Sequence, residues 1–396
     1  MIKASTGNTL YYGDNLTILR EEIGDESVDL IYLDPPFNSN ASYNVLFRAP
    51  EGHQSKAQIE AFDDTWHWNE SAEEAFDAVM KSKNSQASEM LRAMRAFLGM
   101  NDMMAYLAMM AVRLLELHRV LKPTGSLYLH CDPTASHYLR ILLDAVFGKK
   151  NYSNEIIWKR TTAKSLMKRR FPTNHDVILF YSKTEAACWN EDTIFVPYDE
   201  NDLPEKTAAK YVHFDADGRR YRLDSLINPN PDRPNLTYEF LGIKRVWRWT
   251  KERMQRALDA GIVVQSAKGR VPQLKRYIDE QRGLPIDDVW VDVPPINSQA
   301  KERLGYPTQK PVALLERIIA ASSNDRDVIL DPFCGCGTTI HAAHKLKRKW
   351  IGIDVTHLAI NLVQRRLKEA FPRARFVVHG VPQDIDGARA LAAKDK

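Results

Sequence analysis

The alternation of short apolar strands with helical segments at both ends of the chain constrains its fold more than any other feature. Because parallel neighbours need a crossover connection, which is usually a helix, this alternation predicts a doubly wound, mostly parallel α/β sheet. We expect strands that end near Gly13 and that cover 28–33, 126–132, 327–331, 349–354 and 375–380. We expect helices over 71–121, 135–147, 312–322 and 356–370.

The middle of the chain lacks this alternation. Strand-like pieces such as 176–182 are mixed there with loops rich in Pro, Asn and Asp, and NPNPDRPN at 228–235 cannot form regular structure. We therefore predict a separate α+β or irregular domain at 156–300, inserted between two parts of one α/β domain. Those parts cover 1–155, with a helical insert at about 50–120, and 301–380, and a tail follows at 381–396.

Composition and apolar runs argue against several other classes of protein. A hydrophobic content of 44% is ordinary for a globular chain, which disfavours extensive disorder. The longest apolar run, 103–112, is too short to span a bilayer, and no signal-peptide stretch opens the sequence. The four cysteines show no disulfide framework. We expect a cytoplasmic protein that does not associate with membranes.

The excess positive charge lies in the middle of the chain. The net charge is +4, and residues 156–300 hold 24 Lys and Arg against 20 Asp and Glu, so the remainder is balanced. Within that region, 158–183 carries seven basic residues and one acid, Asp176. Such clustering suits the phosphate backbone of DNA, because each neutralised phosphate releases counterions. A solvated basic loop is the alternative, and charge alone does not separate the two.

A glycine-bearing turn, DPFCGCGTT at 331–339, connects a buried strand to a helix. Gly335 and Gly337 let the backbone approach a ligand closely, and the helix N-terminus offers free N–H groups. Asp354 ends the next strand, where a carboxylate can accept hydrogen bonds from ribose hydroxyls. This order predicts a nucleotide-like ligand. No Gly-Lys-Ser/Thr follows, which disfavours a P-loop, and the third glycine of a dinucleotide site is missing.

Cysteine and histidine residues near this turn do not predict a metal site. Cys334 and Cys336 lack a second pair at ligand spacing. His341 and His344 share a helical face, but no acid can be placed beside them. We therefore predict packing or hydrogen-bonding roles for these side chains and no bound metal.

The tetrapeptide Asp34-Pro35-Pro36-Phe37 follows the strand 28–33, at the edge where open α/β sheets place their chemistry. The prolines make the turn rigid and direct the Asp34 side chain and the Pro35 carbonyl to one point. Two acceptors there can hold both hydrogens of an amino group and aim its lone pair at an electrophile. Phe37 can stack on a base that has left the double helix. By itself, the tetrapeptide is also compatible with a turn whose aspartate caps a helix.

Six segments, in this order, resemble the amino-methyltransferases of DNA restriction-modification systems in their β arrangement. They are YGDN (12–15), DPPFNSNASYN (34–44), LKPTGSLYLHCD (121–132), YPTQKP (306–311), DPFCGCGTT (331–339) and IGID (351–354). The resemblance covers most of 1–150 and 300–380. It implies a Rossmann-like, S-adenosylmethionine-dependent methyltransferase fold that is circularly permuted, with 156–300 as an inserted target-recognition domain. The strands of 327–380 would then pack beside those of 8–33.

The resemblance also implies roles for single residues. The catalytic centre would be Asp34, Pro35, Pro36 and Phe37, and a methyl group would pass in line to the exocyclic amine of a flipped-out base. S-adenosylmethionine would lie against the turn, with its ribose on Asp354 and its adenine near Asp14. The turn residues concerned are Asp331, Phe333, Gly335, Gly337 and Thr338, and the methionine carboxylate would lie near Thr308 and Lys310. No Pro-Cys pair occurs, which disfavours cytosine-C5 methylation.

Several alternatives remain open at this point. In the family, an initial Asp in the tetrapeptide is associated mainly with adenine N6 and an initial Ser with cytosine N4, so Asp34 favours site-specific adenine methylation of double-stranded DNA. A non-catalytic DNA-binding protein would be expected to lose Asp34 or the glycines, which this chain keeps. A modification subunit that needs a partner, a cognate restriction endonuclease and a homodimer are further possibilities. The Met-rich segment 88–117 is expected to be core, with a dimer interface as the alternative.

Contacts to DNA are predicted from basic and aromatic residues of the middle region. Candidates for phosphate contacts are Lys159, Arg160, Lys168, Arg169 and Arg170, and candidates for base or backbone contacts are Arg245, Trp247 and Arg248. Phosphate contacts position a protein on DNA, whereas base contacts specify the sequence. The recognition sequence itself cannot be read from these residues.

Overall fold

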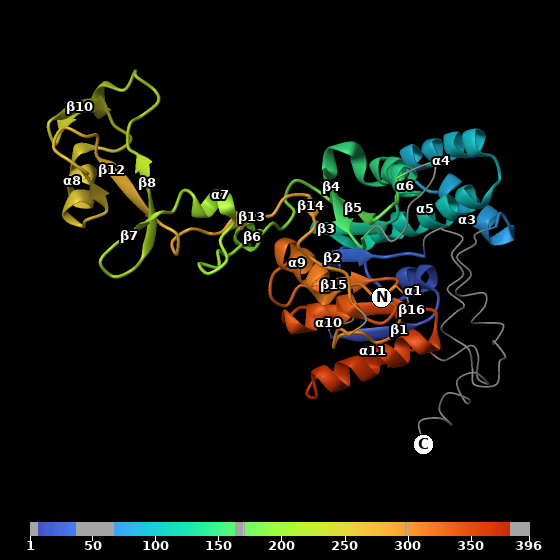
Figure 1. Cartoon of the computed structure of the whole chain (residues 1–396). Helices are drawn as coiled ribbons and strands as arrows, with labels where there is room; N and C mark the ends of the chain where they lie inside the picture. The colour runs from blue at the N-terminus through green and yellow to red at the C-terminus, as the bar shows by residue number, and fades with distance from the viewer. Residues whose placement is uncertain are drawn as a thin grey trace. The chain divides into compact units, whose positions relative to one another are not determined.

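The chain forms two compact units, shown in Figure 1. The first consists of residues up to Thr193 and from Asp287 onward, and the second is Ile194–Ile286. The computed structural model describes residues 7–36, 67–162, 169, 171–297, 299–306 and 308–380.

Nine strands of the first unit form one sheet. Their spatial order is β14 (Val289–Trp290), β4 (Tyr152–Lys159), β5 (His175–Ser182), β3 (Leu121–Cys131), β2 (Val28–Leu33), β15 (Val328–Asp331), β16 (Lys349–Asp354), β1 (Thr9–Tyr12) and β17 (Val377–His379). All neighbouring pairs in this order are parallel except the two that involve β5. The sheet is therefore mostly parallel, as predicted.

Strand β15 connects the N-terminal and C-terminal parts of the sheet, because it lies between β2 and β16. Leu330 is paired with Ile31 on one side and with Ile351 on the other. Strand β1 lies beyond β16, with Tyr12 paired to Asp354. The predicted packing of 327–380 beside 8–33 is confirmed, and so is the circularly permuted, Rossmann-like α/β fold.

Helices cover both faces of this sheet. On one face, α5 (Asp102–Val120) packs against α1 (Asn15–Glu21), α3 (Glu70–Met80), α4 (Ser85–Leu98) and α6 (Ser136–Leu143). On the other face lie α9 (Val312–Ser322), α10 (Thr338–Lys345) and α11 (His357–Ala370). Ile31 and Leu33 of β2 belong to the core under α5, whereas Leu30 and Tyr32 are buried toward the opposite face. Within the described ranges, no helix is long and apolar enough to cross a membrane.

The predicted helical stretch 71–121 consists of three helices. Asn69, Asn84 and Asn101 begin them, since each side chain accepts the backbone N–H of the third residue that follows it. Gly99 ends the middle helix with φ of 74°. Met94, Met104 and Met110 are buried, as expected for core, whereas Phe97 and Met100 of the same Met-rich segment are exposed.

The second unit has a small core of its own. Its antiparallel sheet has the order β11 (Val263–Val264), β12 (Gln273–Tyr277), β8 (Arg220–Ser225), β7 (His213–Phe214). It also contains the hairpin of β9 (Thr237–Phe240) and β10 (Ile243–Val246), the pair β6 (Phe195–Val196) and β13 (Leu284–Pro285), and the helices α7 (Glu205–Ala208) and α8 (Lys251–Asp259). Its core side chains are Leu226, Phe240, Trp247, Met254, Val263 and Leu274.

The boundaries of this second unit differ from the predicted insert. Residues 156–193 and 287–300 lie in the first unit, because β4 and β5 extend the main sheet. Strand β5 is the apolar stretch HDVILFYS, which is buried between β3 and β4 and pairs with both. Burial on both sides explains why this strand is continuously apolar. The irregular sequence around it is the reason why the sequence alone placed it in the inserted region.

A substitution at Gly337 tests how closely α10 packs on α11. Gly337 begins α10 with φ of 75° and ψ of 35°, and a Cβ there would lie 2.7 Å from Cγ2 of Val363. We expect Gly337→Ala to destabilise the protein by about 1–3 kcal/mol through overpacking and left-handed strain. In a Val363→Ala background the same change should cost less, because the clash is relieved. Denaturant unfolding of the four variants measures both effects, and equal costs in the two backgrounds would contradict the packing explanation.

Candidate active site

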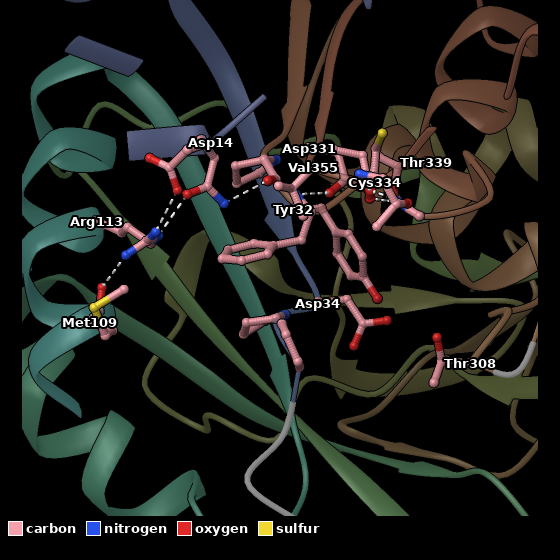
Figure 2. A pocket seen from close by; sticks show the side chains of 18 of the residues that line it. Asp14, Tyr32, Asp34, Met109, Arg113, Thr308, Asp331, Cys334, Thr339 and Val355 are labelled. Atoms are coloured by element: carbon pink, nitrogen blue, oxygen red, sulfur yellow. Dashed lines mark hydrogen bonds and ion pairs between the residues drawn. The ribbon is translucent and has the colours of Figure 1, made fainter. Parts of the chain in front are cut away.

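One cavity collects the sequence motifs at the carboxyl ends of four adjacent strands. Asp14 follows β1, Asp34 follows β2, and Asp331 and Asp354 end β15 and β16. The cavity has a volume of about 550 Å³, which lies in the range of small-molecule sites. Figure 2 shows the side chains of Asp14, Asp34 and Asp331 converging from separate elements. The carboxyl ends of parallel strands are where open α/β sheets bind ligands.

The predicted catalytic tetrapeptide borders this cavity, and its aspartate is held by a lysine from a distant segment. Asp34, Pro35 and Pro36 line the cavity, and Phe37 lies outside the described residues. Nζ of Lys310 donates to Oδ2 of Asp34 at 2.5 Å, and the lysine side chain is buried. Lys310 therefore pairs with the predicted catalytic carboxylate, and its Nζ also donates to the carbonyl of Thr308. Its predicted place near a methionine carboxylate stays a prediction.

The glycine turn is tied to Asp354 through its backbone. The N–H of Gly335 donates to Oδ2 of Asp354 at 2.9 Å, while Oδ1 accepts the N–H and the hydroxyl of Thr356. A Cβ on Gly335, whose φ is 49°, would lie 3.2 Å from the ring of Tyr306. The turn therefore needs glycine both for its conformation and for this close approach. Gly337 is not among the lining residues, and its observed contact is with Val363.

Asp331 is the most perturbed carboxyl of the cavity. Burial, together with the nearby Asp34 and Asp354, raises its pKa to about 7, although the N–H of Phe333 donates to its Oδ1. Burial also raises the pKa of Asp354 above its ordinary value. Carboxyl groups crowded into one site cannot all ionise freely, and a cationic ligand would favour their ionised forms.

A buried arginine anchors the other end of the cavity. Arg113 of α5 donates from NH2 to Oδ2 of Asp14 at 2.9 Å and from Nε to Oδ1 of Asn15 at 2.6 Å. Nδ2 of Asn15 donates in turn to the carbonyl of Pro332 in the glycine turn. Asp14 also begins α1, because it accepts the N–H of Thr17. This connection between α5, α1 and the glycine turn orients Asp14 at the cavity wall.

Sequence reasoning missed Arg113 and Tyr306 as lining residues. Arg113 directly follows the longest apolar run of the chain, and a charged residue on a buried helix is the signal that could have found it. Tyr306 lies in the YPTQKP segment, and its burial, with Asp354 and the thiols of the turn nearby, raises its pKa well above the usual value. Its ring contact with Gly335 could not be read from spacing.

Two cysteines line the cavity without reactive character. Burial raises the thiol pKa of Cys334 and of Cys336, so both stay protonated near neutral pH. All four cysteines of the chain are free thiols. In the parts of the chain that the structure describes, no group of three or more His, Cys, Asp or Glu side chains has the arrangement of a metal site.

The predicted DNA contacts are distributed over both units. Lys159, Arg160 and Arg169 of the first unit are exposed, whereas Lys168 and Arg170 lie outside the described residues. In the second unit, Arg245 and Arg248 are exposed. The prediction for Trp247 is wrong, because this side chain is fully buried in the core of the second unit. Its Nε1 donates to the carbonyl of Tyr238.

Comparisons with known proteins agree with the geometry. The chain matches a family described as DNA methylase (N6_N4_Mtase) over residues 28–365. Type II methyltransferase M.EcaI of Enterobacter cloacae is 29% identical over 364 residues, which cover 91% of this chain and 69% of that protein. The Mod subunit of the type III restriction-modification enzyme StyLTI of Salmonella typhimurium is 23% identical, over 86% of this chain and 50% of the subunit. A solved M1.HpyAVI–SAM complex is 15% identical, covers 91% of this chain and 98% of that chain, and has a TM-score of 0.41.

The sheet order and the cavity at its strand ends define a Rossmann-like α/β domain with a ligand site. The chain belongs to the N6/N4 DNA methylase family, which its sequence matches over most of its length. It is accordingly a DNA methyltransferase with S-adenosylmethionine as its cofactor. The chain spans 69% of the length of M.EcaI and half of the StyLTI subunit.

The cavity fits S-adenosylmethionine in size and in charge. It is lined by four aspartates (Asp14, Asp34, Asp331 and Asp354) and by the cations Arg113 and Lys310. The cofactor carries a sulfonium, an ammonium and one carboxylate, so an acidic cavity matches its net positive charge. Of the predicted cofactor-binding residues, all except Gly337 line the cavity.

The raised pKa of Asp331 predicts a pH-dependent stability difference. With a folded pKa of about 7 against an ordinary value of 3.8, the carboxyl stays protonated in the folded chain while the unfolded chain is ionised. The stability that this proton contributes is present below about pH 4 and is lost as the pH rises to about 7. Relative to wild type, Asp331→Asn should therefore gain about 1–3 kcal/mol between pH 5 and pH 8. Urea unfolding without cofactor measures this gap, and a pH-independent gap would contradict the burial explanation.

Proposed function

We propose that the chain is a site-specific DNA methyltransferase that modifies adenine N6 in double-stranded DNA. The observation that carries this proposal is the meeting of the Asp34-Pro35-Pro36 turn with the glycine turn in one cavity. The first presents acceptors for an amino group, and the second provides a site for the methyl donor. An acceptor and a donor site that share one cavity can bring the reacting atoms into line.

The residues of the chain orient the amino group rather than attack the base. The Asp34 carboxylate and the Pro35 carbonyl accept the two N–H bonds, which localises the nitrogen lone pair. Because Lys310 holds Oδ2 of Asp34, we assign Oδ1 as the acceptor for the substrate. S-adenosylmethionine, when bound, supplies an electrophilic methyl group for direct in-line transfer. The proton that the methylated nitrogen loses passes to Asp34 or to water.

A covalent enzyme–base intermediate is not part of this proposal. Cys334 and Cys336 line the cavity, but their raised thiol pKa values keep them protonated and poorly nucleophilic. An exocyclic amine needs no such intermediate, because its own nitrogen is the nucleophile. To reach a cavity at the strand ends, the target base must leave the double helix.

Adenine is favoured over cytosine N4 by the residue that begins the tetrapeptide. In the family, Asp at this position is associated mainly with adenine, and this chain has Asp34. Cytosine N4 is the alternative. The StyLTI Mod subunit belongs to a restriction-modification enzyme by name, which suggests a cognate restriction endonuclease for this chain.

We assign target recognition to the inserted second unit and to the basic segment before it. Arg245 and Arg248 are exposed on the second unit, and Lys159 and Arg169 are exposed on the first. These four cations suit contacts to phosphates or to base edges. A homodimer remains an additional proposal, and exposed Phe97 and Met100 near the α4–α5 turn are candidates for its interface.

Substitution of Asp34 tests the catalytic assignment. We expect Asp34→Ala to lower methyl transfer by a factor of at least about 100, because one of the two acceptors that orient the amine is lost. Cofactor affinity, measured by calorimetry, should change little, since Asp34 is assigned to the substrate. Asp25→Ala, an exposed aspartate paired with Arg119, is the matched control and should retain full activity. Retained turnover in Asp34→Ala would rule out the assigned role.

The identity of the modified base is tested directly in cells. Modification-sensitive long-read sequencing of DNA from a host that expresses the protein should report N6-methyladenine within one short sequence motif. N4-methylcytosine at a defined motif would correct the base assignment and keep the rest of the proposal. Unmodified DNA, with folded protein and cofactor present, would support a non-catalytic protein or one that lacks a partner.

A further inference from the structure

A line of buried polar side chains runs from the cavity to the basic segment. The hydroxyl of Tyr32, which lines the cavity, lies 2.8 Å from Nδ1 of His130. Nε2 of His130 lies 3.0 Å from Oδ2 of Asp176, and Oδ1 of Asp176 lies 3.1 Å from Nε of Arg160. His130 is fully buried and Asp176 is 2% exposed, so neither can use water as its main partner.

Three neighbouring strands hold this line in place. Tyr32 is on β2, two residues before Asp34, while His130 is on β3 and Asp176 is on β5. The indole ring of Trp158 packs edge-on against the His130 ring, with ring centroids 5.7 Å apart. Arg160 directly follows β4, and its backbone N–H donates to the carbonyl of Asn174. Each member therefore sits on, or next to, a strand of the main sheet.

The charge of Asp176 decides which group donates to it. Burial opposes ionisation of Asp176, but the hydrogen bond and the positive charge of His130, together with the cations Lys310 and Arg160, lower its pKa below the ordinary value. Asp176 is thus a carboxylate, which can only accept, so Nε2–H of His130 donates to it. The other ring nitrogen, Nδ1, lies within hydrogen-bond distance of the hydroxyl of Tyr32.

Arg160 lies partly at the surface and partly against the buried Asp176. Its side chain is 43% exposed, although one end lies against the buried carboxylate of Asp176. The contact is an ion pair and not an aligned hydrogen bond, since Oδ1 of Asp176 has no partner with hydrogen-bond geometry. The exposed part of the guanidinium can meet a phosphate while the inner part faces Asp176. A simple phosphate contact would not need a buried carboxylate behind it.

We propose that Arg160, Asp176 and His130 are positioning residues that act through Tyr32 on the strand end that carries Asp34. The proposal rests on the proposed methyl transfer to DNA and deepens it. Contact of Arg160 with a phosphate near the target would hold Asp176, His130 and Tyr32 in position. The end of β2 would then keep Asp34 in the orientation that methyl transfer needs. Lys310 contributes to the same region, because it pairs with Asp34 and also acts electrostatically on Asp176.

A double-mutant cycle on turnover tests this proposal. The full-length protein transfers tritiated methyl groups from S-adenosylmethionine to unmethylated plasmid DNA, and kcat and KM for DNA are measured separately. We expect Arg160→Gln and Tyr32→Phe each to lower kcat by about tenfold, because small misplacements of reacting groups are costly. The double variant should be no worse than the worse single variant, since both act through one line. Arg160→Lys, which keeps the charge, should recover part of kcat.

Two controls separate the line from simpler explanations. Arg365→Gln removes an exposed arginine that is paired with Glu369 on α11, and it should leave kcat and KM unchanged. If Arg160→Gln raises only KM for DNA and leaves kcat intact, Arg160 is a plain phosphate contact and the proposal is overturned. Single effects that multiply in the double variant would overturn it as well. If Tyr32→Phe does not fold, the kcat-against-KM split of Arg160→Gln and its recovery in Arg160→Lys decide the question.

A spectroscopic measurement keeps this proposal distinct from the proposed function. In protein labelled with ¹⁵N-histidine, we expect the proton of His130 on Nε2, with a resonance that moves in both Arg160→Gln and Tyr32→Phe. A proton on Nδ1 alone, or a resonance that does not respond to Arg160→Gln, would contradict the line without any turnover. Inactive wild-type protein with the expected resonances would instead contradict the proposed function and leave the line itself supported.

Discussion

The parallel pairing of β2 with β15 is the interaction on which the rest of the structure depends. Ile31 and Leu330 lie side by side although they are about 300 residues apart in sequence, and this pairing places Asp34 beside the glycine turn. Without it, the Asp34-Pro35-Pro36 turn and the glycine turn would lie in two separate parts of the chain and would not share one cavity. The pairing is stabilised from both faces, since α5 covers one side of β2 and the helices after β15 cover the other. The inserted unit interrupts the chain between these halves without interrupting the sheet.

Charge organises the site that this pairing creates. Four aspartates line one cavity, and burial raises the pKa of Asp331 and of Asp354, so a net positive cofactor would relieve their mutual repulsion. The two cations of the cavity each hold one aspartate: Arg113 holds Asp14, and Lys310 holds Asp34. Asp14 and Asp34 are therefore already oriented by these two cations before a positively charged cofactor binds. Orientation in advance is what an enzyme needs when its main task is to aim an amine at a methyl group.

Much of the fold and of the site could be predicted because both depend on local patterns. The strand ends at Asp34, Asp331 and Asp354 follow from short apolar runs, and the glycine turn follows from DPFCGCGTT. The insert was placed too broadly, because β4 and β5 are separated from the rest of the sheet by loops and charges that resemble the inserted unit. Trp247 is a sequence candidate for DNA contact together with Arg245 and Arg248, yet its indole is part of the core of the second unit. Local composition does not show which side of a small domain a side chain faces.

The sequence by itself determined the order of the motifs and the α/β class, since these depend on residue type and spacing. Only the tertiary structure decided which distant residues meet. The pairing of Lys310 with Asp34, the anchoring of Asp14 by Arg113, and the line from Tyr32 to Arg160 each join segments that share no pattern in sequence. The physical reason is that a buried charge needs a partner close to it in space. The order of the strands in the sheet, and not the distance along the sequence, determines which residues are close enough.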